Sequence, residues 1–215
     1  MSLFGKPLIA YSIEAAQRSG VVDRVVVSTD DEEIAAVSRR LGAEVPFLRP
    51  SELAGDRANV LDALQHALQY LDETEGYRSD YVLTLQPTSP LIEPEQIKRG
   101  LALASEKQAE SVVSVVELPH RHHPHNIRET RGDETTRFWM EPEHYRVLNR
   151  QERPAFYAYG NLYVSSWELL ALRRLLEGER NYSFLIDPLT ALDIDGPEDL
   201  ALIELIMEAR ARRAS

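Results

Sequence analysis

Residues 81–90 read YVLTLQPTSP, a short apolar run that ends in a polar loop stiffened by two prolines. The apolar and β-branched side chains of the first five residues are typical of a buried β-strand. In open α/β sheets ligands bind outside the carboxyl ends of the strands, so we expect the loop from Gln86 to Leu91 to border a binding site. A rigid structural turn is the alternative explanation of the same loop.

Strands and helices alternate on both sides of this segment. Further apolar and β-branched runs predict strands at residues 24–28, 111–116 and 156–164. Helical periodicity and capping residues predict helices over residues 7–20, 30–42 and 59–71, and helices that begin near Pro94, Ser165 and Pro197. This alternation predicts one α/β domain over residues 1–215, with a mostly parallel sheet covered by crossover helices.

The composition narrows the class of protein. The chain has 215 residues with a formal net charge of −11, which argues against binding to nucleic acid or to an anionic membrane and favours a small ligand. It has no cysteine, which excludes disulfides, thiolate zinc sites and cysteine nucleophiles. No run approaches the roughly 18 apolar residues of a membrane span, so we expect a soluble, cytoplasmic protein.

The regular pattern fails between about residues 118 and 155, which we interpret as an insertion into the domain. This interval holds five of the six histidines and the aromatic cluster Phe138-Trp139-Met140. The tract from His120 to His125 resembles a transition-metal site, but three-histidine zinc sites usually combine distant segments of a chain. A solvated loop, or a surface that meets another subunit, explains the tract better.

The beginning of the chain departs from the usual order of such folds. A helix is expected at residue 7 with no strand before it, whereas doubly wound sheets normally open with a central strand and a phosphate-binding turn. We therefore expect that the first strand and its phosphate loop are missing from this chain.

Asp193-Ile194-Asp195 is the strongest candidate for a metal site. In an extended segment the two carboxylates project from one face while Ile194 turns into the core. Magnesium prefers such hard oxygen ligands, together with phosphate oxygens and water. The alternative is helix capping, because Asp195 directly precedes the helix expected at Pro197.

Other polar side chains follow the predicted strands. Gln86, Thr88 and Ser89 offer donors to a carboxylate, sugar or phosphate. Ser28 lies at a second strand-to-helix corner, where capping is the simpler explanation. Arg150, at the end of the insertion, suits a carboxylate or phosphate, although by base rate alone a surface ion pair is the better explanation of an arginine.

Taken together, several segments resemble the acylneuraminate cytidylyltransferase family in their order along the chain. They are Gly5 to Ile9, Asp23 to Asp31, Phe47 to Pro50, Glu52 to Ala54 with Asp56, Gln86 to Leu91, Arg150-Gln151 and Asp193 to Asp195. The Gln-Pro-Thr-Ser-Pro block is the most specific of these markers.

The resemblance implies a Rossmann-like nucleotidyltransferase that joins CMP from CTP to an acidic nine-carbon sugar of the sialic-acid type and releases pyrophosphate. It implies Mg²⁺ as cofactor, held by Asp193 and Asp195 as catalytic ligands, and a homodimer in which the insertion is the dimerisation arm. It also assigns the remaining candidates, with Gln86, Thr88, Ser89, Arg150 and Asn161 on the sugar side and Ser28 and Arg49 on the nucleotide side.

Three departures from the family pattern shape the expectations. The phosphate loop is absent, Ile92 stands where the family often has arginine, and Tyr159-Gly160-Asn161 replaces an expected Asn-Gly pair. We therefore expect low activity, since preorganised phosphate contacts stabilise the transition state.

The rival interpretations are a catalytically silent sugar- or nucleotide-binding homologue and a nucleotidyltransferase for another sugar or polyol phosphate. The sequence leaves open whether the sugar is sialic, legionaminic or pseudaminic acid.

Overall fold

The chain folds around one four-stranded sheet, seen in a computed structural model that describes residues 2–55, 58–130, 132, 135–146 and 149–214. The strands lie in the order β3 (Tyr81–Leu85), β7 (Tyr157–Ser166), β4 (Ser111–Glu117) and β8 (Asn181–Leu185). β4 and β8 are parallel, but β7 lies antiparallel between β3 and β4. The sheet is therefore mixed, and the expectation of a mostly parallel sheet is wrong in this respect, because one reversed central strand makes two of the three pairings antiparallel.

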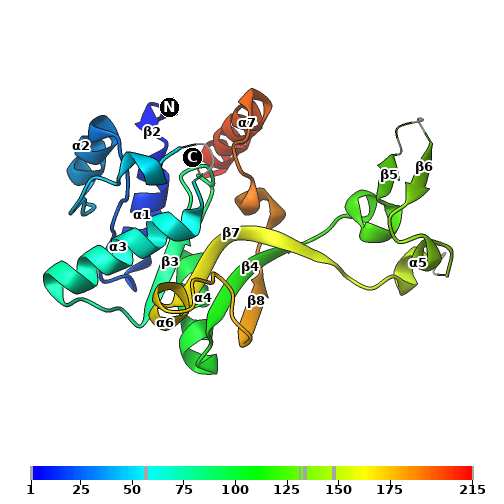
Figure 1. The fold of residues 1–215 in the computed structure, drawn as a ribbon. Helices are drawn as coiled ribbons and strands as arrows, with labels where there is room; N and C mark the ends of the chain where they lie inside the picture. Colours follow the sequence, from blue (N-terminus) through cyan, green and yellow to red (C-terminus); the bar gives the residue numbers. More distant parts are fainter. Residues whose placement is uncertain (1, 56–57, 131, 133–134, 147–148, 215) are drawn as a thin grey trace.

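Helices cover the sheet and connect its strands (Figure 1). They are α1 (Ile9–Ser19), α2 (Glu32–Arg40), α3 (Val60–Glu75), α4 (Pro94–Lys107), α6 (Trp167–Ala171) and α7 (Pro197–Ala214). Their ends follow from local chemistry. The Asp31 side chain accepts the Ile34 N–H at 2.9 Å and so caps α2, and the Asn59 side chain caps α3 in the same way. A capping box between Glu93 and Gln96 opens α4.

The main core lies where α1 and α4 pack on the sheet. Its buried side chains include Ala15, Ala16, Ile97, Ala104, Val112, Leu162, Val164 and Phe184. Gly100 on α4 allows this close approach, because a Cβ atom there would lie 3.1 Å from the Leu162 side chain and 3.2 Å from that of Val164.

A second, smaller hydrophobic cluster lies beside the C-terminal helix α7. It joins the N-terminal residues, the loop after β3 and α7 through Leu3, Leu8, Leu91, Ile194 and Ile203. Leu3 belongs to a hairpin of two-residue strands, β1 (Ser2–Leu3) and β2 (Lys6–Pro7), which precedes α1 and forms its own small sheet. The expectation that no strand precedes the first helix is therefore corrected, although this hairpin is not part of the main sheet.

Residues 24–28 do not form the strand expected of them. Val26 makes a single parallel bridge with Glu44, supported by the Val27 N–H to Glu44 O and Glu44 N–H to Val25 O bonds, both 2.8 Å. β3 is an edge strand of the main sheet. A cavity lies between β3 and residues 24–28, so these residues have no described strand beside them on that side. A β-branched run becomes a regular strand only when hydrogen-bonding partners are available along it.

The interval predicted as an insertion, residues 118–155, forms an arm that projects from the sheet on the long β4 and β7 strands (Figure 1). The arm contains β5 (Arg128–Thr130) paired with β6 (Thr136–Phe138), the short helix α5 (Glu141–Arg146) and turns of 3-10 helix. No helix in the described part of the chain is long and apolar enough to cross a membrane.

Candidate functional site

The segment Asp193 to Asp195 lies directly against the loop that follows β3. The Ile194 N–H donates to the Thr88 carbonyl at 2.9 Å, and the Ser89 hydroxyl donates to the Asp193 carboxylate. Ile194 is buried in the cluster with Leu91. The structure therefore brings Asp193 against the loop that begins at Gln86.

The two aspartates differ in their surroundings. Asp193 is half-buried and bonded to Ser89, while Asp195 is exposed, and no hydrogen bond of its carboxylate to another described residue is seen. Asp199 accepts the N–H groups of Asp195 and Gly196 at 3.1 and 2.9 Å. Asp199 therefore serves the start of α7 where the sequence suggested Asp195 as the alternative cap, and the Asp195 carboxylate remains available to a ligand.

These carboxylates suit a magnesium ion. They are hard oxygen donors two residues apart with buried Ile194 between them, and magnesium needs only one or two such ligands when phosphates and water complete its shell. Within the described residues no group of three or more His, Cys, Asp or Glu side chains could hold a metal ion. In the histidine tract, the side chains of His123 and His125 are buried and make ring contacts with each other and with Phe156.

Three of the predicted residues meet at a large cavity. Ser28, Arg49 and Gln86 all line a cavity of about 1420 Å³. Ser28 Oγ and Arg49 Nε are buried and find no hydrogen-bond partner among the described residues. A second nitrogen of Arg49 lies 3.6 Å from the Asp30 carboxylate. Unsatisfied buried polar atoms are costly, so this end of the cavity is suited to a polar ligand.

Asn161 occupies a different position from the one its predicted role requires. It is fully buried on β7, and its amide nitrogen donates to Thr190 O at 2.7 Å and Gln96 Oε1 at 3.1 Å. The Ser114 hydroxyl donates to its Oδ1 at 3.2 Å. These bonds tie β7 to α4 and to η5 (Pro188–Ala191), the turn that leads into Asp193. Asn161 thus supports the site from beneath, and its predicted contact with the sugar stays a prediction.

Tyr159 is a residue to which the sequence assigned no role at the site. Its hydroxyl is buried without a hydrogen-bond partner in the described structure, and its ring stacks on Tyr163 with 4.2 Å between centroids. Burial raises the pKa of Tyr159 above its usual value, and the neighbouring Tyr163 and the charge of Asp193 raise it further. An aromatic residue in a strand usually indicates packing, so no sequence signal distinguishes this hydroxyl.

Two predicted positions are not placed at the site. Arg150 begins η4 (Arg150–Glu152) within the arm, and the structure does not describe its side chain. Asp56, part of the family resemblance, lies outside the described residues. The sugar-side role of Arg150 stays a prediction.

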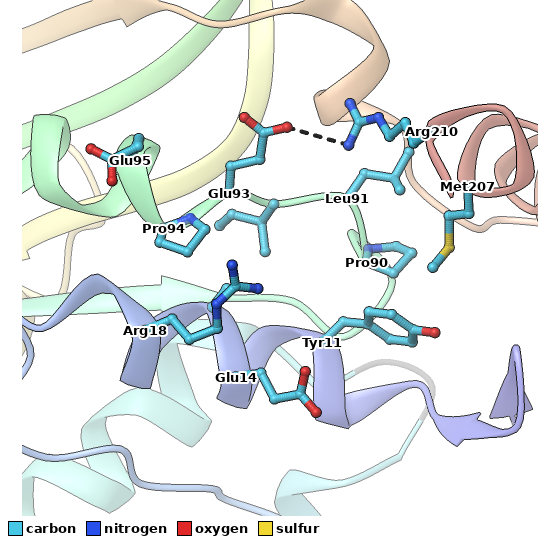
Figure 2. Close-up of a pocket in the computed structure, with 12 residues that line it drawn as sticks. Tyr11, Glu14, Arg18, Pro90, Leu91, Glu93, Pro94, Glu95, Met207 and Arg210 are labelled. Atoms are coloured by element: carbon cyan, nitrogen blue, oxygen red, sulfur yellow. Dashed lines mark ion pairs between the residues drawn. The ribbon is translucent and has the colours of Figure 1, made fainter. Parts of the chain in front are cut away.

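A second pocket lies on the other side of the loop, between α1, the start of α4 and α7. It has a volume of about 540 Å³ and contains none of the predicted site residues. Figure 2 shows Glu93 paired with Arg210, with Arg18 and Tyr11 below them. The Glu93–Arg210 distance is 3.3 Å. The predicted site residues therefore lie elsewhere, near Asp193 and along the large cavity.

Comparison with known proteins identifies the family. The sequence pattern of the cytidylyltransferases matches residues 1–213. The chain belongs to the cytidylyltransferase family. This cytidylyltransferase is 32% identical to the CMP-N,N'-diacetyllegionaminic acid synthase of Legionella pneumophila over 209 residues, which cover 96% of this chain and 87% of that protein.

Two further relatives are named as cytidylyltransferases of similar acidic sugars. The pseudaminic acid cytidylyltransferase of Campylobacter jejuni is 26% identical and covers 100% of this chain and 90% of its own length. The N-acylneuraminate cytidylyltransferase of Escherichia coli is 28% identical over 99% of this chain but only 49% of its own length. The cytidylyltransferase described here thus belongs with enzymes of nonulosonic acids, as its sequence motifs indicate.

Solved structures support the fold. A CMP:2-keto-3-deoxy-manno-octonic acid synthetase complexed with CTP superposes with a TM-score of 0.68 over 98% of this chain and 91% of that chain, at 16% identity. The 4-diphosphocytidyl-2C-methyl-D-erythritol synthase of Anaerococcus prevotii superposes with a TM-score of 0.66 at 12% identity, over 97% and 92% of the two chains. At this identity the likeness concerns the α/β nucleotidyltransferase fold alone.

Proposed function

We propose that this cytidylyltransferase transfers CMP from CTP to an acidic nine-carbon sugar of the sialic-acid type and releases pyrophosphate. The names of the relatives support the substrate class, and one observation carries the site. Asp193 lies next to the loop of Gln86, Thr88 and Ser89, bonded to Ser89 and held by the Ile194 to Thr88 backbone bond of 2.9 Å. One metal ion, one triphosphate and one sugar can therefore meet at this edge of the sheet.

The chemistry follows from this arrangement. The anomeric hydroxyl of the sugar attacks the α-phosphorus of CTP and releases its proton to water, a new P–O bond forms, and the bond to the pyrophosphate oxygen breaks so that pyrophosphate leaves. Asp193 and Asp195 would hold a magnesium ion, which would supply positive charge where negative charge accumulates on the phosphates. Ser89 orients the Asp193 carboxylate through its hydrogen bond, and Asn161 supports η5 beneath it.

The remaining predicted residues bind and orient the substrates in this proposal. The amide of Gln86 and the hydroxyl of Thr88 face the sugar, and Arg150 contributes a cation to its carboxylate. Ser28 and Arg49 hold the nucleotide at the polar end of the large cavity, where their unsatisfied atoms support that role.

We propose slow turnover for residues 1–215. Four cations line the large cavity, and each is already paired with a carboxylate, in the pairs Arg24–Glu44, Arg49–Asp30, Arg78–Asp72 and Lys98–Glu95. A triphosphate would have to displace these carboxylates, and no glycine- and lysine-bearing loop lies among the described residues that line the cavity. The same observation favours the second candidate, a binding protein without catalysis.

We propose that the arm mediates a homodimer. It exposes large apolar side chains, with Trp139 67% exposed, Tyr145 60% and Ile127 46%. Aromatic residues are enriched at protein interfaces, and a projecting arm buries little of its own surface.

The use of CTP and the lack of cysteine support a cytoplasmic location for this enzyme.

A pyrophosphate-release assay with CTP, Mg²⁺ and N-acetylneuraminic, legionaminic and pseudaminic acids tests the proposal. We expect slow formation of a CMP-sugar with at least one of them, falling by about 100-fold or more in Asp193→Asn and Asp195→Asn because charge stabilisation is lost. Glu198→Gln, an exposed neighbour, is the matched control and keeps the activity. Binding of CTP by calorimetry without any product would instead establish the silent binding protein.

A further inference from the structure

The pocket between α1, the start of α4 and α7 has the size of a small-molecule site. Its volume of about 540 Å³ lies within the roughly 300–1,000 Å³ of typical ligand pockets. Its floor is apolar, because Ala15, Leu91 and Ile92 line the pocket and all three are buried. Tyr11 and Met207 also line it. The pocket therefore offers a concave apolar surface to the body of a ligand.

The carboxylates that line this pocket are each paired with a nearby cation. The three pairs are Glu14–Lys6 at 2.7 Å, Glu93–Arg210 at 3.3 Å and Glu95–Lys98 at 2.6 Å. Among the described residues that line the pocket, an anionic ligand therefore meets no uncompensated carboxylate, although the chain as a whole has a formal net charge of −11.

Arg18 lines the same pocket from the last turn of α1. No ion pair or hydrogen bond joins its side chain to another residue in the part of the chain that the structure describes. Figure 2 shows this side chain reaching from α1 toward Pro94, while Glu14 points the other way. A guanidinium presents a planar fork of N–H donors that matches a carboxylate or phosphate. Arg18 is therefore placed to bind an anionic group beside the apolar floor.

The Glu93–Arg210 pair can open to admit the same anion. The Arg210 side chain is 41% exposed and that of Glu93 is 50% exposed, and exposed pairs contribute at most about 1 kcal/mol. Glu93 also has a second function, because its side chain takes part in the capping box with Gln96 at the start of α4. Arg210 can therefore exchange Glu93 for a ligand while Glu93 stays bonded to its own helix.

We propose that this pocket binds a small molecule that carries one anionic group, a carboxylate or a phosphate ester, on an apolar body. The anionic group lies at Arg18 with support from Arg210, and the apolar body covers Leu91 and Ile92. Leu91 also belongs to the buried cluster of Ile194, so the ligand contacts the back of the loop that follows β3. The inference rests on the pocket and its charges and does not depend on the proposed function.

An NMR titration tests the inference. The probes are phenylbutyrate and phenyl phosphate, which separate the two kinds of anion, and phenylbutanol is the neutral control. We expect saturable shifts of the backbone amide signals of Arg18, Ile92 and Met207 with at least one anion, and binding of the alcohol weaker by about tenfold or more. Shifts centred on Ser28 or Asp195 would place the anion elsewhere and overturn the inference. Equal binding of the alcohol, or no saturable shift with either anion, would also overturn it.

Two variants change the charges of the pocket in opposite directions. Arg18→Met keeps an apolar stem and should weaken binding of the anion by about tenfold or more. Glu93→Gln removes the carboxylate that competes for Arg210 but keeps an oxygen for the capping box, and should tighten binding by about threefold. Arg40→Met, on α2 outside the pocket, is the matched control and should not change the affinity.

The opposite signs keep the test sharp. Unchanged affinity in Arg18→Met, or weaker binding in Glu93→Gln, would overturn the inference, and the second variant decides it if the first fails to fold. Because amide signals report binding without turnover, a chain that is inactive with CTP still gives a clear result.

Discussion

The edge of the sheet around Asp193 and the arm over residues 118–155 are held together in different ways. At the sheet edge the polar groups bond to one another in the interior, as Asn161 does to Gln96, Thr190 and Ser114. In the arm, ion pairs such as Arg137–Glu129 lie at the surface, and Trp139 and Tyr145 are exposed. The first region is therefore held by its own buried hydrogen bonds, whereas the second leaves apolar surface exposed, which suits the proposed dimer contact.

The largest expected effect contrasts two asparagines, one in each region. Asn161→Ala leaves several buried groups without partners and should lower the free energy of unfolding by about 3 kcal/mol. Asn126 in the arm makes two bonds, to His120 O at 2.7 Å and from Arg153 at 2.8 Å, in a more exposed setting. Asn126→Ala should cost less than about 1 kcal/mol. Urea unfolding measures both, and equal costs would remove the contrast.

A change in the arm should affect association more than folding. Trp139→Ser removes an exposed aromatic side chain and should weaken the dimer by about 2 kcal/mol, or roughly 30-fold in Kd, the size of an interface hot spot. Sedimentation at several concentrations gives the Kd. The urea midpoint of the monomer should not move, and a fall in monomer stability with unchanged association would mean that the arm is held by internal packing instead.

A smaller effect is expected from the hydroxyl that orients Asp193. Ser89→Ala removes a hydrogen bond to a charged carboxylate and should lower stability by about 1.5 kcal/mol. It should also weaken Mn²⁺ binding in the presence of CTP, because Asp193 is no longer oriented. Ser105→Ala, an exposed serine on α4, is the matched control. Full metal affinity in Ser89→Ala would show that Asp193 needs no such support.

The smallest effect concerns the pH dependence of the arm. Burial lowers the pKa of His125, and the positive charges of His123, Arg153 and His144 lower it further, against the opposing effect of Glu143. The unfolded arm therefore takes up a proton near the ordinary value of about 6.5, before the folded arm does. The free energy of unfolding of the arm is therefore highest above this pH and should fall by about 0.5 kcal/mol as the pH drops toward 5. Amide exchange in the arm measures this loss, which His125→Gln should abolish.

The parts of the fold that depend on neighbouring residues were predictable from the sequence. The caps at Asp31 and Asn59 and the helix start at Pro94 all lie where the predicted helices begin. The loop from Gln86 follows its strand because the apolar run and the prolines act locally. These features require no knowledge of distant contacts.

The remainder depends on contacts between distant residues. The direction of β7 depends on which strands lie beside it, so the sequence could not distinguish a mixed sheet from a parallel one. Ser89 and Asp193 are 104 residues apart, and the sequence therefore suggested a ligand contact for Ser89 where the structure shows a bond to Asp193. The valines of residues 24–28 have the composition of a strand, but the prediction of a regular strand is wrong because such a strand needs partners along its edges.

Paramagnetic broadening by Mn²⁺ in the presence of CTP tests the central claim most directly. If Asp193 and Asp195 hold the ion beside the loop, the backbone amide signals of Thr88 and Ser89 should broaden first, and those of β5 in the arm should be unaffected. Asp193→Asn combined with Asp195→Asn should abolish the broadening, while Glu198→Gln should preserve it. Broadening centred on the tract from His120 to His125, or unchanged in the double variant, would contradict the account.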